Sequence, residues 1–416
     1  MNILFIHQNF PGQYKHIVLA LAAQGGHQLV ALGIEPAWKA LPNGVAYVQY
    51  PIQRGTTPGI QPWVQDLETK AIRGEACAAA AHGLKVQGFQ PDLICGHPGW
   101  GEMLFLRDLW PEVPILTYQE FFYQLQGFDS CFDPELQPQP DWQAAARIRL
   151  KGVNPTLSLE ASSWCITPTA FQRSSFPAIW QPRISVIHDG VNTAAIQPNP
   201  EAPPLQLPDG TTLRQGDPIV TFVNRRIEPY RGCHTMIRSI PELQRLAPEA
   251  RLVIVGEATG VSYGSPCPNG EWKDHFLAEI EGQFDPSRVH FTGSLDYRVF
   301  IHLFQLSAAH VYLTYPFVLS WSLLEAMACG CAVVGSATAP VQEVIRHGHN
   351  GLLVDFFKPG DLAAAVAELL ANRPLAQRLG TEARQTVQTS YSLERCLPRQ
   401  LALMSLVGNR AIGADR

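Results

Sequence analysis

The stretch NILFIHQNFPGQYKHIVLALAAQGGHQLVALG, residues Asn2–Gly33, decides the fold class. It opens with NILFIH, a short apolar run of the kind found in strands buried within a parallel sheet. Apolar residues then recur at helical spacing, and a Gly-Gly pair ends that pattern before a second apolar run, QLVALG. A strand, a helix and a second strand in this order form a βαβ unit, so we expect an α/β domain here.

The same alternation of apolar runs and helical patterns continues along the chain. A Pro-rich stretch, Ile196–Gly210, divides it into two sets and is the clearest candidate for a linker. We therefore predict two doubly wound α/β domains, at residues 1–195 and 196–391, with ligands bound beyond the carboxyl ends of the strands, in a cleft between the domains. The predicted strands are 2–7, 28–33, 92–96, 114–118, 164–168 and 184–190 in the first set, and 219–223, 251–256, 289–293, 310–315, 332–336 and 351–356 in the second.

Composition argues against several classes of protein. A net charge of −5 lacks the basic footprint of a general nucleic-acid binder, so we expect no nucleic-acid partner. The nine cysteines contain no Cys-x-x-Cys pair and are interpreted as buried, reduced side chains of a cytoplasmic protein. The N-terminus has no positive leader, and no run of 18 apolar residues predicts a membrane span. The chain has no obvious Asp-x-Asp motif, and no metal site is predicted.

The first candidate site lies in FVNRRIEPYRG, Phe222–Gly232. Arg226 and Arg231 follow a predicted strand at the edge where ligands are expected. Because arginine binds phosphate oxygens in a bidentate manner and keeps its charge, these side chains suit a diphosphate. The alternative, which the residues alone leave open, is a pair of solvated surface arginines facing Glu228.

The second candidate is SWSLLEAMACG, where apolar and small residues have helical spacing up to Gly330. Glu325, one turn into this helix, can accept two hydrogen bonds from the diol of a ribose. Alternatively, Glu325 only complements the helix dipole. The first turn offers backbone N–H groups that suit an anion, those of Ser320, Trp321, Ser322 and Leu323.

Three residues of the first domain are further candidates. Gly12 lies in NFPGQY, a strand-to-helix loop without the G-x-G-x-x-G pattern, so an ordinary turn is the alternative. His97 in GHPGWGE and Glu120 in TYQEFFY each follow a predicted strand, which places them at the ligand-binding edge of the sheet. A purely structural histidine is the alternative for His97.

Several segments together resemble one family. NFPGQYKHIVLALAAQGGHQLVAL, VIHDGVNTAAIQP and NRRIEPYRG are similar to landmarks of the retaining glycosyltransferases of family 4, as are LVIVGE, VHFTGSL and PVQEVIRHGHNGLLVD. The resemblance covers almost the whole chain. It implies the GT-B architecture, in which two Rossmann-like domains face a cleft. A C-terminal helix, at about residues 392–416, is then expected to pack back on the first domain.

The resemblance also implies roles for the candidates. Arg226 and Arg231 would hold the donor diphosphate and stabilise the charge that grows on it, and Glu325 would hold the donor ribose. The amides of Ser320–Leu323 would add to the phosphate site, and Gly12 would let the first loop approach donor and acceptor. The implied reaction transfers a hexose-type sugar from a nucleotide diphosphate sugar to a hydroxyl acceptor with retention of configuration, without a cofactor or metal.

One position departs from the family pattern. The family usually has a second Glu eight residues before Glu325, where it contacts the donor sugar, but this chain has Phe317. We interpret the change as the trait of a subgroup that lacks the first Glu of the Glu-x7-Glu motif. His97 and Glu120 would line the sugar or acceptor site.

The expected partners are a nucleotide-sugar donor, with UDP before GDP, and a glycan, a lipid-linked or a small-molecule acceptor, in glycan or surface polysaccharide biosynthesis. The cations of AAARIRLKG, Ala144–Gly152, indicate either weak membrane contact or a solvated basic face. Two alternatives to a transferase stay open. One is a sugar-nucleotide epimerase or phosphorylase of the same architecture, and the other is a non-catalytic partner subunit. The sequence predicts no oligomeric state.

Overall fold

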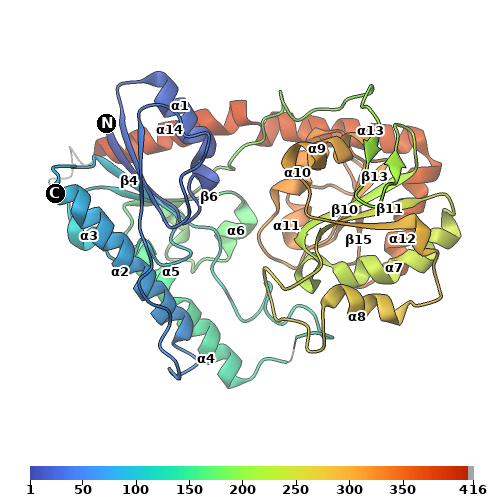
Figure 1. Cartoon of the computed structure of the whole chain (residues 1–416), viewed down its shortest axis with the longest axis horizontal. Coiled ribbons are helices and arrows are strands. Elements are labelled where there is room, and N and C mark those ends of the chain that lie inside the picture. The colour runs from blue at the N-terminus through green and yellow to red at the C-terminus, as the bar shows by residue number, and fades with distance from the viewer. Residues whose placement is uncertain (138, 411–416) are drawn as a thin grey trace. The chain divides into compact units, whose positions relative to one another are not determined.

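The computed structural model describes residues 1–137 and 139–410 of the chain, except for the side chain of Arg410. The chain forms two compact units (Figure 1). Unit 1 comprises Met1–Asp189 and the segment from Cys396 onward, and unit 2 comprises Gly190–Arg395. The chain thus leaves unit 1 once and returns to it at its end. Positions 411–416 of the predicted C-terminal helix lie outside the described residues.

Unit 1 is built on a seven-stranded parallel sheet in the order β3-β2-β1-β4-β5-β6-β7. Six strands occupy predicted runs, and the edge strand β3 is an addition that the sequence analysis does not contain. Its VAYVQ segment lies at the edge of the sheet beside β2 and is partly exposed. It therefore does not need the continuous apolar run of a buried strand, and its sequence does not have one. The strands are β1 Asn2–Ile6, β2 Gln28–Gly33, β3 Val45–Gln49, β4 Leu93–Gly96, β5 Ile115–Tyr118, β6 Trp164–Thr167 and β7 Ile184–Val186.

Each face of this sheet is covered by helices. Side chains alternate along β1, so they enter two different cores on the two faces. Ile3 and Phe5 enter a core that also holds apolar side chains of α1 and α14. Leu4 and Ile6 enter the opposite core, which α2 completes. The helices are α1 Lys15–Gln24, α2 Gln65–Val86, α3 Leu106–Leu109, α4 Trp142–Lys151, α5 Val153–Ala161, α6 Ala170–Ser174 and α14 Leu393–Arg410, with 3₁₀ turns at Gly12–Tyr14 and Gln181–Arg183.

Unit 2 is built on a six-stranded parallel sheet in the order β12-β11-β10-β13-β14-β15, with a separate antiparallel pair, β8-β9. All six strands of the parallel sheet occupy predicted runs. They are β10 Ile219–Arg226, β11 Arg251–Glu257, β12 Val289–Gly293, β13 Ala309–Tyr312, β14 Val333–Ser336 and β15 Leu352–Val354, and the short pair is β8 Leu205–Gln206 with β9 Thr212–Leu213.

Helices α9, α10 and α13 contribute to one large core of unit 2. Helix α7 packs on α12 and on α8. The helices are α7 Cys233–Leu246, α8 Trp272–Glu279, α9 Tyr297–Leu306, α10 Trp321–Ala328, α11 Ala339–Gln342, α12 Pro359–Ala371 and α13 Arg373–Thr386, with 3₁₀ turns at Pro229–Arg231 and Pro286–Arg288 and a π turn at Val387–Tyr391.

The Pro-rich stretch is not a linker between the units, which corrects the sequence interpretation. It lies wholly inside unit 2, and the passage between the units falls earlier, between Asp189 and Gly190. Ile196, Leu205 and Leu207 of this stretch are buried in the core of unit 2. Prolines there shape turns between apolar anchor residues, so composition alone gives the wrong impression of an unpacked segment.

A close contact between α13 and the turn after α10 leads to a prediction. A Cβ on Gly380 would lie 2.1 Å from the carbonyl oxygen of Gly330. The oxygen belongs to the backbone and cannot turn away as a side chain can, so the Gly380→Ala variant must shift α13, at a cost of roughly 3 kcal/mol of folding free energy. We expect its midpoint of thermal unfolding to fall clearly. Gly360→Ala on α12 is the control, because a Cβ there meets nothing within 4 Å. That variant should be neutral or slightly more stable, and equal midpoints for both variants would contradict the contact.

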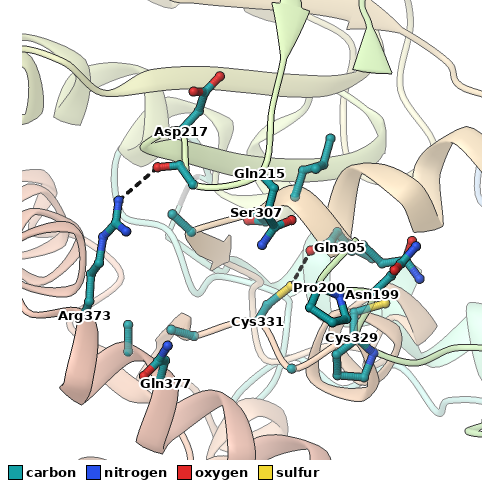
Figure 2. A pocket seen from close by; sticks show the side chains of 18 of the residues that line it. Asn199, Pro200, Gln215, Asp217, Gln305, Ser307, Cys329, Cys331, Arg373 and Gln377 are labelled. Carbon is teal, nitrogen blue, oxygen red and sulfur yellow. Dashed lines mark hydrogen bonds between the residues drawn. The ribbon is translucent and has the colours of Figure 1, made fainter. Parts of the chain in front are cut away.

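A pocket of about 420 Å³ opens in unit 2 (Figure 2). Its lining includes Asp217, Ala308 and Ala332, which precede β10, β13 and β14. The pocket therefore lies at the amino ends of these strands, whereas ligands of open α/β sheets bind at the carboxyl ends. We therefore expect the chemistry at the opposite edge of the sheet.

No helix in the described part of the chain is long and apolar enough to cross a bilayer, and all nine cysteines are free thiols.

Candidate nucleotide-sugar site

A cluster of polar and aromatic side chains surrounds Arg231 in unit 2, just beyond the carboxyl end of β10. This side chain is only 7% exposed. Its Nη1 donates hydrogen bonds to Thr314 Oγ1 at 2.8 Å and to the carbonyl oxygen of Val318 at 2.9 Å. Both acceptors lie between β13 and α10. These bonds and the burial fix a full positive charge at the edge of the sheet where parallel α/β domains bind ligands.

Aromatic rings enclose the same guanidinium. Its central carbon lies 5.2 Å from the ring centroid of Tyr263 and 5.8 Å from that of Phe317. The two rings are also in edge contact, with centroids 4.9 Å apart, and Tyr230 joins them. Phe317, which stands where the family usually has a Glu, is therefore a buried aromatic side chain, 2% exposed, that packs beside the cation.

Arg226 ends β10 and lies half exposed. Its Nη1 donates to the carbonyl oxygen of Thr259, on the loop that follows β11. The Glu228 carboxylate is buried and accepts the backbone N–H groups of Ser262 and Tyr263 on the same loop. Burial raises the pKa of Glu228. The loop 258–263 is thus held by Arg226 and Glu228, and it carries the Tyr263 ring to the site.

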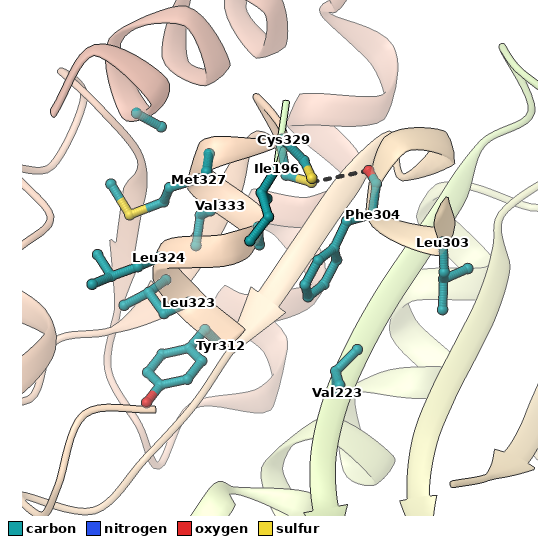
Figure 3. Close-up of a cluster of buried hydrophobic side chains, with 14 of the residues drawn as sticks. Ile196, Val223, Leu303, Phe304, Tyr312, Leu323, Leu324, Met327, Cys329 and Val333 are labelled. Atoms are coloured by element: carbon teal, nitrogen blue, oxygen red, sulfur yellow. Dashed lines mark hydrogen bonds between the residues drawn. The ribbon is translucent and has the colours of Figure 1, made fainter. Parts of the chain in front are cut away.

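Helix α10 is positioned by its apolar face. Leu323, Leu324 and Met327 point into the unit 2 core (Figure 3). Glu325, between them in sequence, is 9% exposed, and its Oε1 accepts a hydrogen bond of 2.6 Å from the Tyr297 hydroxyl at the start of α9. Burial and the neighbouring carboxylate raise the pKa of Tyr297, so its hydroxyl remains a donor. Glu325 therefore already accepts a hydrogen bond from one hydroxyl group, as a carboxylate that binds a ribose is expected to do.

The first turn of α10 is less open than the sequence suggests. The Ser320 amide donates to the Tyr312 hydroxyl at 2.8 Å, and the Ser322 amide donates to Ser320 Oγ at 3.3 Å. The Leu323 amide donates to the Ser320 carbonyl oxygen at 3.3 Å. Three of the four amides named as anion ligands thus have internal acceptors, and an anion would have to replace them. The fourth residue, Trp321, exposes 46% of its surface.

A second polar cluster lies in unit 1, at the carboxyl ends of β1, β4 and β5. His97 is buried and stacks on Trp100 and Tyr118, with ring centroids at 4.5 and 5.6 Å. Its Nδ1 accepts the Gly99 amide at 3.1 Å, so the neutral ring carries its proton on Nε2. Burial lowers the pKa of His97, which keeps the ring neutral. Its Nε2 makes no hydrogen bond in the described structure and lies 3.9 Å from Glu120 Oε2.

Sequence reasoning missed His7 in this cluster. Its ring centroid lies 5.6 Å from that of His97, and its Nε2 hydrogen-bonds Gln13 Oε1 at 2.8 Å. Gly12 is required beside it for two reasons. Its φ of +47° lies in the left-handed region, and a Cβ would come within 2.3 Å of the His7 ring. Gly12 thus lets the first loop close over His7, and this contact could be found only in three dimensions.

Glu102 is a buried carboxyl group five residues after His97, and it gives a pH-dependent prediction. It is fully buried, and neither carboxyl oxygen has a hydrogen-bond partner among the described residues. Burial raises its pKa to about 7, against a smaller opposing effect of Arg73. Protonation is favoured in the folded state, so the contribution of Glu102 to stability is fully present below pH 4.5, the ordinary pKa in the unfolded chain, and is lost as pH rises through 7.

We expect Glu102→Gln to remove this dependence and to exceed the wild type in unfolding free energy at pH 8 by on the order of 2–3 kcal/mol. Thermal unfolding of both proteins between pH 5 and pH 8 measures the effect. Glu75→Gln, at an exposed position of α2, is the control and should follow the wild type. A wild type as stable as Glu102→Gln at pH 8 would contradict the prediction.

Comparison with known proteins accounts for most of the chain. Residues 25–196 match the family model "Glycosyl transferase family 4 group", and residues 207–386 match "Glycosyl transferases group 1". An uncharacterized glycosyltransferase of Methanocaldococcus jannaschii is 25% identical, over 41% of each chain. A D-inositol 3-phosphate glycosyltransferase of Nocardioides is 25% identical over 79% of this chain and 75% of the relative.

The fold of the chain also resembles that of a solved structure. The structure of HepE from Anabaena in complex with UDP-glucose is 15% identical, with a TM-score of 0.65 over 98% of this chain and 100% of that one. This likeness concerns the fold, and the two parallel sheets described above are those of the GT-B architecture. The fold and the two family matches agree, and the chain is a group 1 glycosyltransferase with the GT-B fold.

Proposed function

We propose that this enzyme transfers a hexose-type sugar from a nucleotide diphosphate sugar to a hydroxyl acceptor, with retention of anomeric configuration. The observation that carries the proposal is the buried cation of Arg231 beside the carboxyl end of β10, with the hydroxyl-binding carboxylate of Glu325 on neighbouring α10. A UDP sugar is the preferred donor and a GDP sugar the second choice. The Anabaena neighbour, which was solved with UDP-glucose, supports that order.

Charge stabilisation is the main task that we assign to the protein. Cleavage of the bond between sugar and diphosphate leaves negative charge on the phosphate oxygens. A cation held in a water-poor environment stabilises that charge more than one in water. Arg231 is held in this way. Arg226, the last residue of β10, is the second proposed cation. The diphosphate oxygens then help to take the proton of the attacking acceptor hydroxyl, which approaches from the leaving-group side.

We assign nucleoside binding to Glu325. Its carboxylate accepts the Tyr297 hydroxyl, and we propose that ribose hydroxyls take the same acceptor positions when the donor binds. Phe317 places an aromatic ring, rather than a carboxylate, beside Arg231, and we propose that this marks a subgroup of the family with an apolar wall at the donor.

In unit 1, we propose that His97 and Glu120 bind hydroxyl groups of the sugar or acceptor. The proton on His97 Nε2 makes this atom a donor, and Glu120 is an acceptor 3.9 Å away, so together they match one hydroxyl group. The name of the Nocardioides relative specifies a phosphorylated polyol acceptor, which is consistent with a hydroxyl-rich acceptor here. Glycan or surface polysaccharide biosynthesis in the cytoplasm is the setting that we propose.

A thermal-shift screen against UDP, GDP, ADP, CMP and dTDP tests the donor site. A ligand that binds only the folded state raises the midpoint of unfolding. We expect one nucleotide to stabilise the wild type and to leave Glu325→Ala unchanged. Sugars carried by that nucleotide are then tested for transfer, and NMR of the product's anomeric proton reads the configuration. Inversion would refute retention, and a complete absence of nucleotide binding would favour the non-catalytic alternative.

A further inference from the structure

Helix α4 in unit 1 is exposed to an unusual degree. None of its ten residues is buried, and Trp142 at its start exposes 70% of its surface. Leu157 on the following helix, α5, exposes 45%. Short helices are held mainly by burying an apolar face, and exposed apolar side chains that lie together mark contact surfaces. The surface around α4 therefore points to a binding role.

An apolar groove of about 560 Å³ runs between α4, α5 and the segment after β5. Arg149 is the one charged side chain among the described residues that line it. Most of the remaining lining is apolar or aromatic, and its large members are Phe122, Tyr123, Leu125, Ile148, Val153 and Leu157. Such a lining offers few partners for the hydroxyl groups of a sugar, whereas a hydrocarbon chain needs none.

The walls of this groove are fixed by contacts of their own. The Phe122 amide donates to Ser175 Oγ at 3.0 Å, and its ring packs on Phe176 with centroids 5.8 Å apart. The next residue of this segment, Tyr123, is held against α4, because the ammonium of Lys151 at the end of that helix lies 3.4 Å from the Tyr123 ring centroid. The groove is therefore already formed before any ligand enters.

The charge beside the groove is positive, in a chain whose net charge is −5. Arg147 and Arg149 are exposed on α4, and α4 itself contains no acidic residue. The acidic groups near α4 include Asp141, Asp66 and the buried Asp129, whose charge acts on Lys151. Asp141 caps α4 by accepting the Ala144 amide, and Asp66 on α2 pairs with Lys70 at 2.7 Å. A hydrocarbon groove with a cationic rim matches an anionic amphiphile.

We propose that this surface docks on an anionic lipid bilayer, with an acyl chain in the groove, a lipid phosphate at Arg149 on its lining, and other anionic head groups at Arg147 on a different face of α4. The wall that starts at Phe122 begins two residues after Glu120. One wall of the groove therefore belongs to the same segment as Glu120, which we assign to the sugar or acceptor site. The inference names a lipid-linked acceptor, and for that point alone it rests on the proposed function.

Co-sedimentation of the full chain with vesicles tests the proposal without donor or catalysis. The vesicles are phosphatidylcholine alone or mixed with phosphatidylglycerol. We expect binding to the mixed vesicles only, weakened by salt. Leu157→Asp should weaken it about tenfold through lost apolar contact. The double variant Arg147→Gln/Arg149→Gln should weaken it by at least about tenfold through lost charge.

Leu246→Asp on α7 is the matched control, since Leu246 is a leucine with a similar exposure of 40% in unit 2. It should bind vesicles as the wild type does. Equal binding by Leu157→Asp and the wild type, or no binding to any vesicle, would overturn the proposal. A wild type that is dimeric in solution while Leu157→Asp is monomeric would do the same, by assigning the groove to a second copy of the chain. Nucleotide thermal shifts in the same variants report the donor site separately.

Discussion

The Arg231→Met variant is expected to bind the nucleotide-sugar donor about a thousandfold more weakly than the wild type. Loss of a buried cation that faces a diphosphate removes charge-assisted hydrogen bonds worth roughly 4 kcal/mol. Methionine keeps much of the apolar stem against Tyr263 and Phe317, so the aromatic cluster around it is retained. Isothermal titration with the nucleotide found in the screen gives the dissociation constant directly.

Arg231 also supports the fold, because it donates to Thr314 Oγ1 and the Val318 carbonyl oxygen. Its removal leaves these buried acceptors unpaired, at a cost of about 1–3 kcal/mol each. The variant is therefore studied well below its own unfolding midpoint. Arg245→Met is the control, because that exposed arginine pairs with Glu242 on the surface. Donor affinity within threefold of the wild type in folded Arg231→Met would remove Arg231 from the site.

For Glu325→Ala, we expect the affinity for the nucleotide to fall at least about a hundredfold. Two charge-assisted hydrogen bonds to a ribose diol contribute roughly 3 kcal/mol or more together. The Tyr297 hydroxyl loses its acceptor in the same variant, so some loss of stability will accompany the loss of binding. The measurement is again titration with nucleotide, now compared with the free nucleobase, whose binding should not change.

Tyr297→Phe separates the two roles of Glu325. It keeps the carboxylate but removes the hydroxyl that now occupies it, so nucleotide affinity should be unchanged or higher. Glu325→Gln keeps the size of the side chain but loses its charge, and it should fall between the wild type and the alanine variant. If Tyr297→Phe weakened nucleotide binding as much as Glu325→Ala did, the hydrogen-bonded pair would matter for the fold rather than for ribose.

The sequence predicted the fold class well because buried parallel strands are short apolar runs. Twelve such runs were identified, and all lie in the two parallel sheets. The edge strand β3 escaped because half-exposed residues interrupt its pattern. The Pro-rich stretch misled for the opposite reason. Its apolar residues are too widely spaced to suggest a core, although Ile196 and Leu205 are buried in one.

The candidate site could be predicted only in part. Arg231 is a candidate because of its residue type and its position after a strand, and Glu325 because it lies one turn into a helix. The structure buries both side chains. The partners of these groups come from distant segments, so Tyr297 could not be inferred from the helix that carries Glu325. Burial itself is a tertiary property. Neither His7 nor Glu102 stands out in the sequence, and both matter only because other elements remove them from water.

The path of α14 has a consequence for synthesis. Leu403, Met404 and Val407 of this helix belong to the same core as Ile17 and Val18 of α1. Unit 2 is therefore complete in the nascent chain before unit 1 can be. Until α14 has been made, the α1 face of the first sheet lacks the part of its cover that α14 supplies and exposes apolar side chains. We expect chaperone contact to concentrate on that early sheet, and stop codons just before Cys396 to yield insoluble protein even though all of unit 2 has been made.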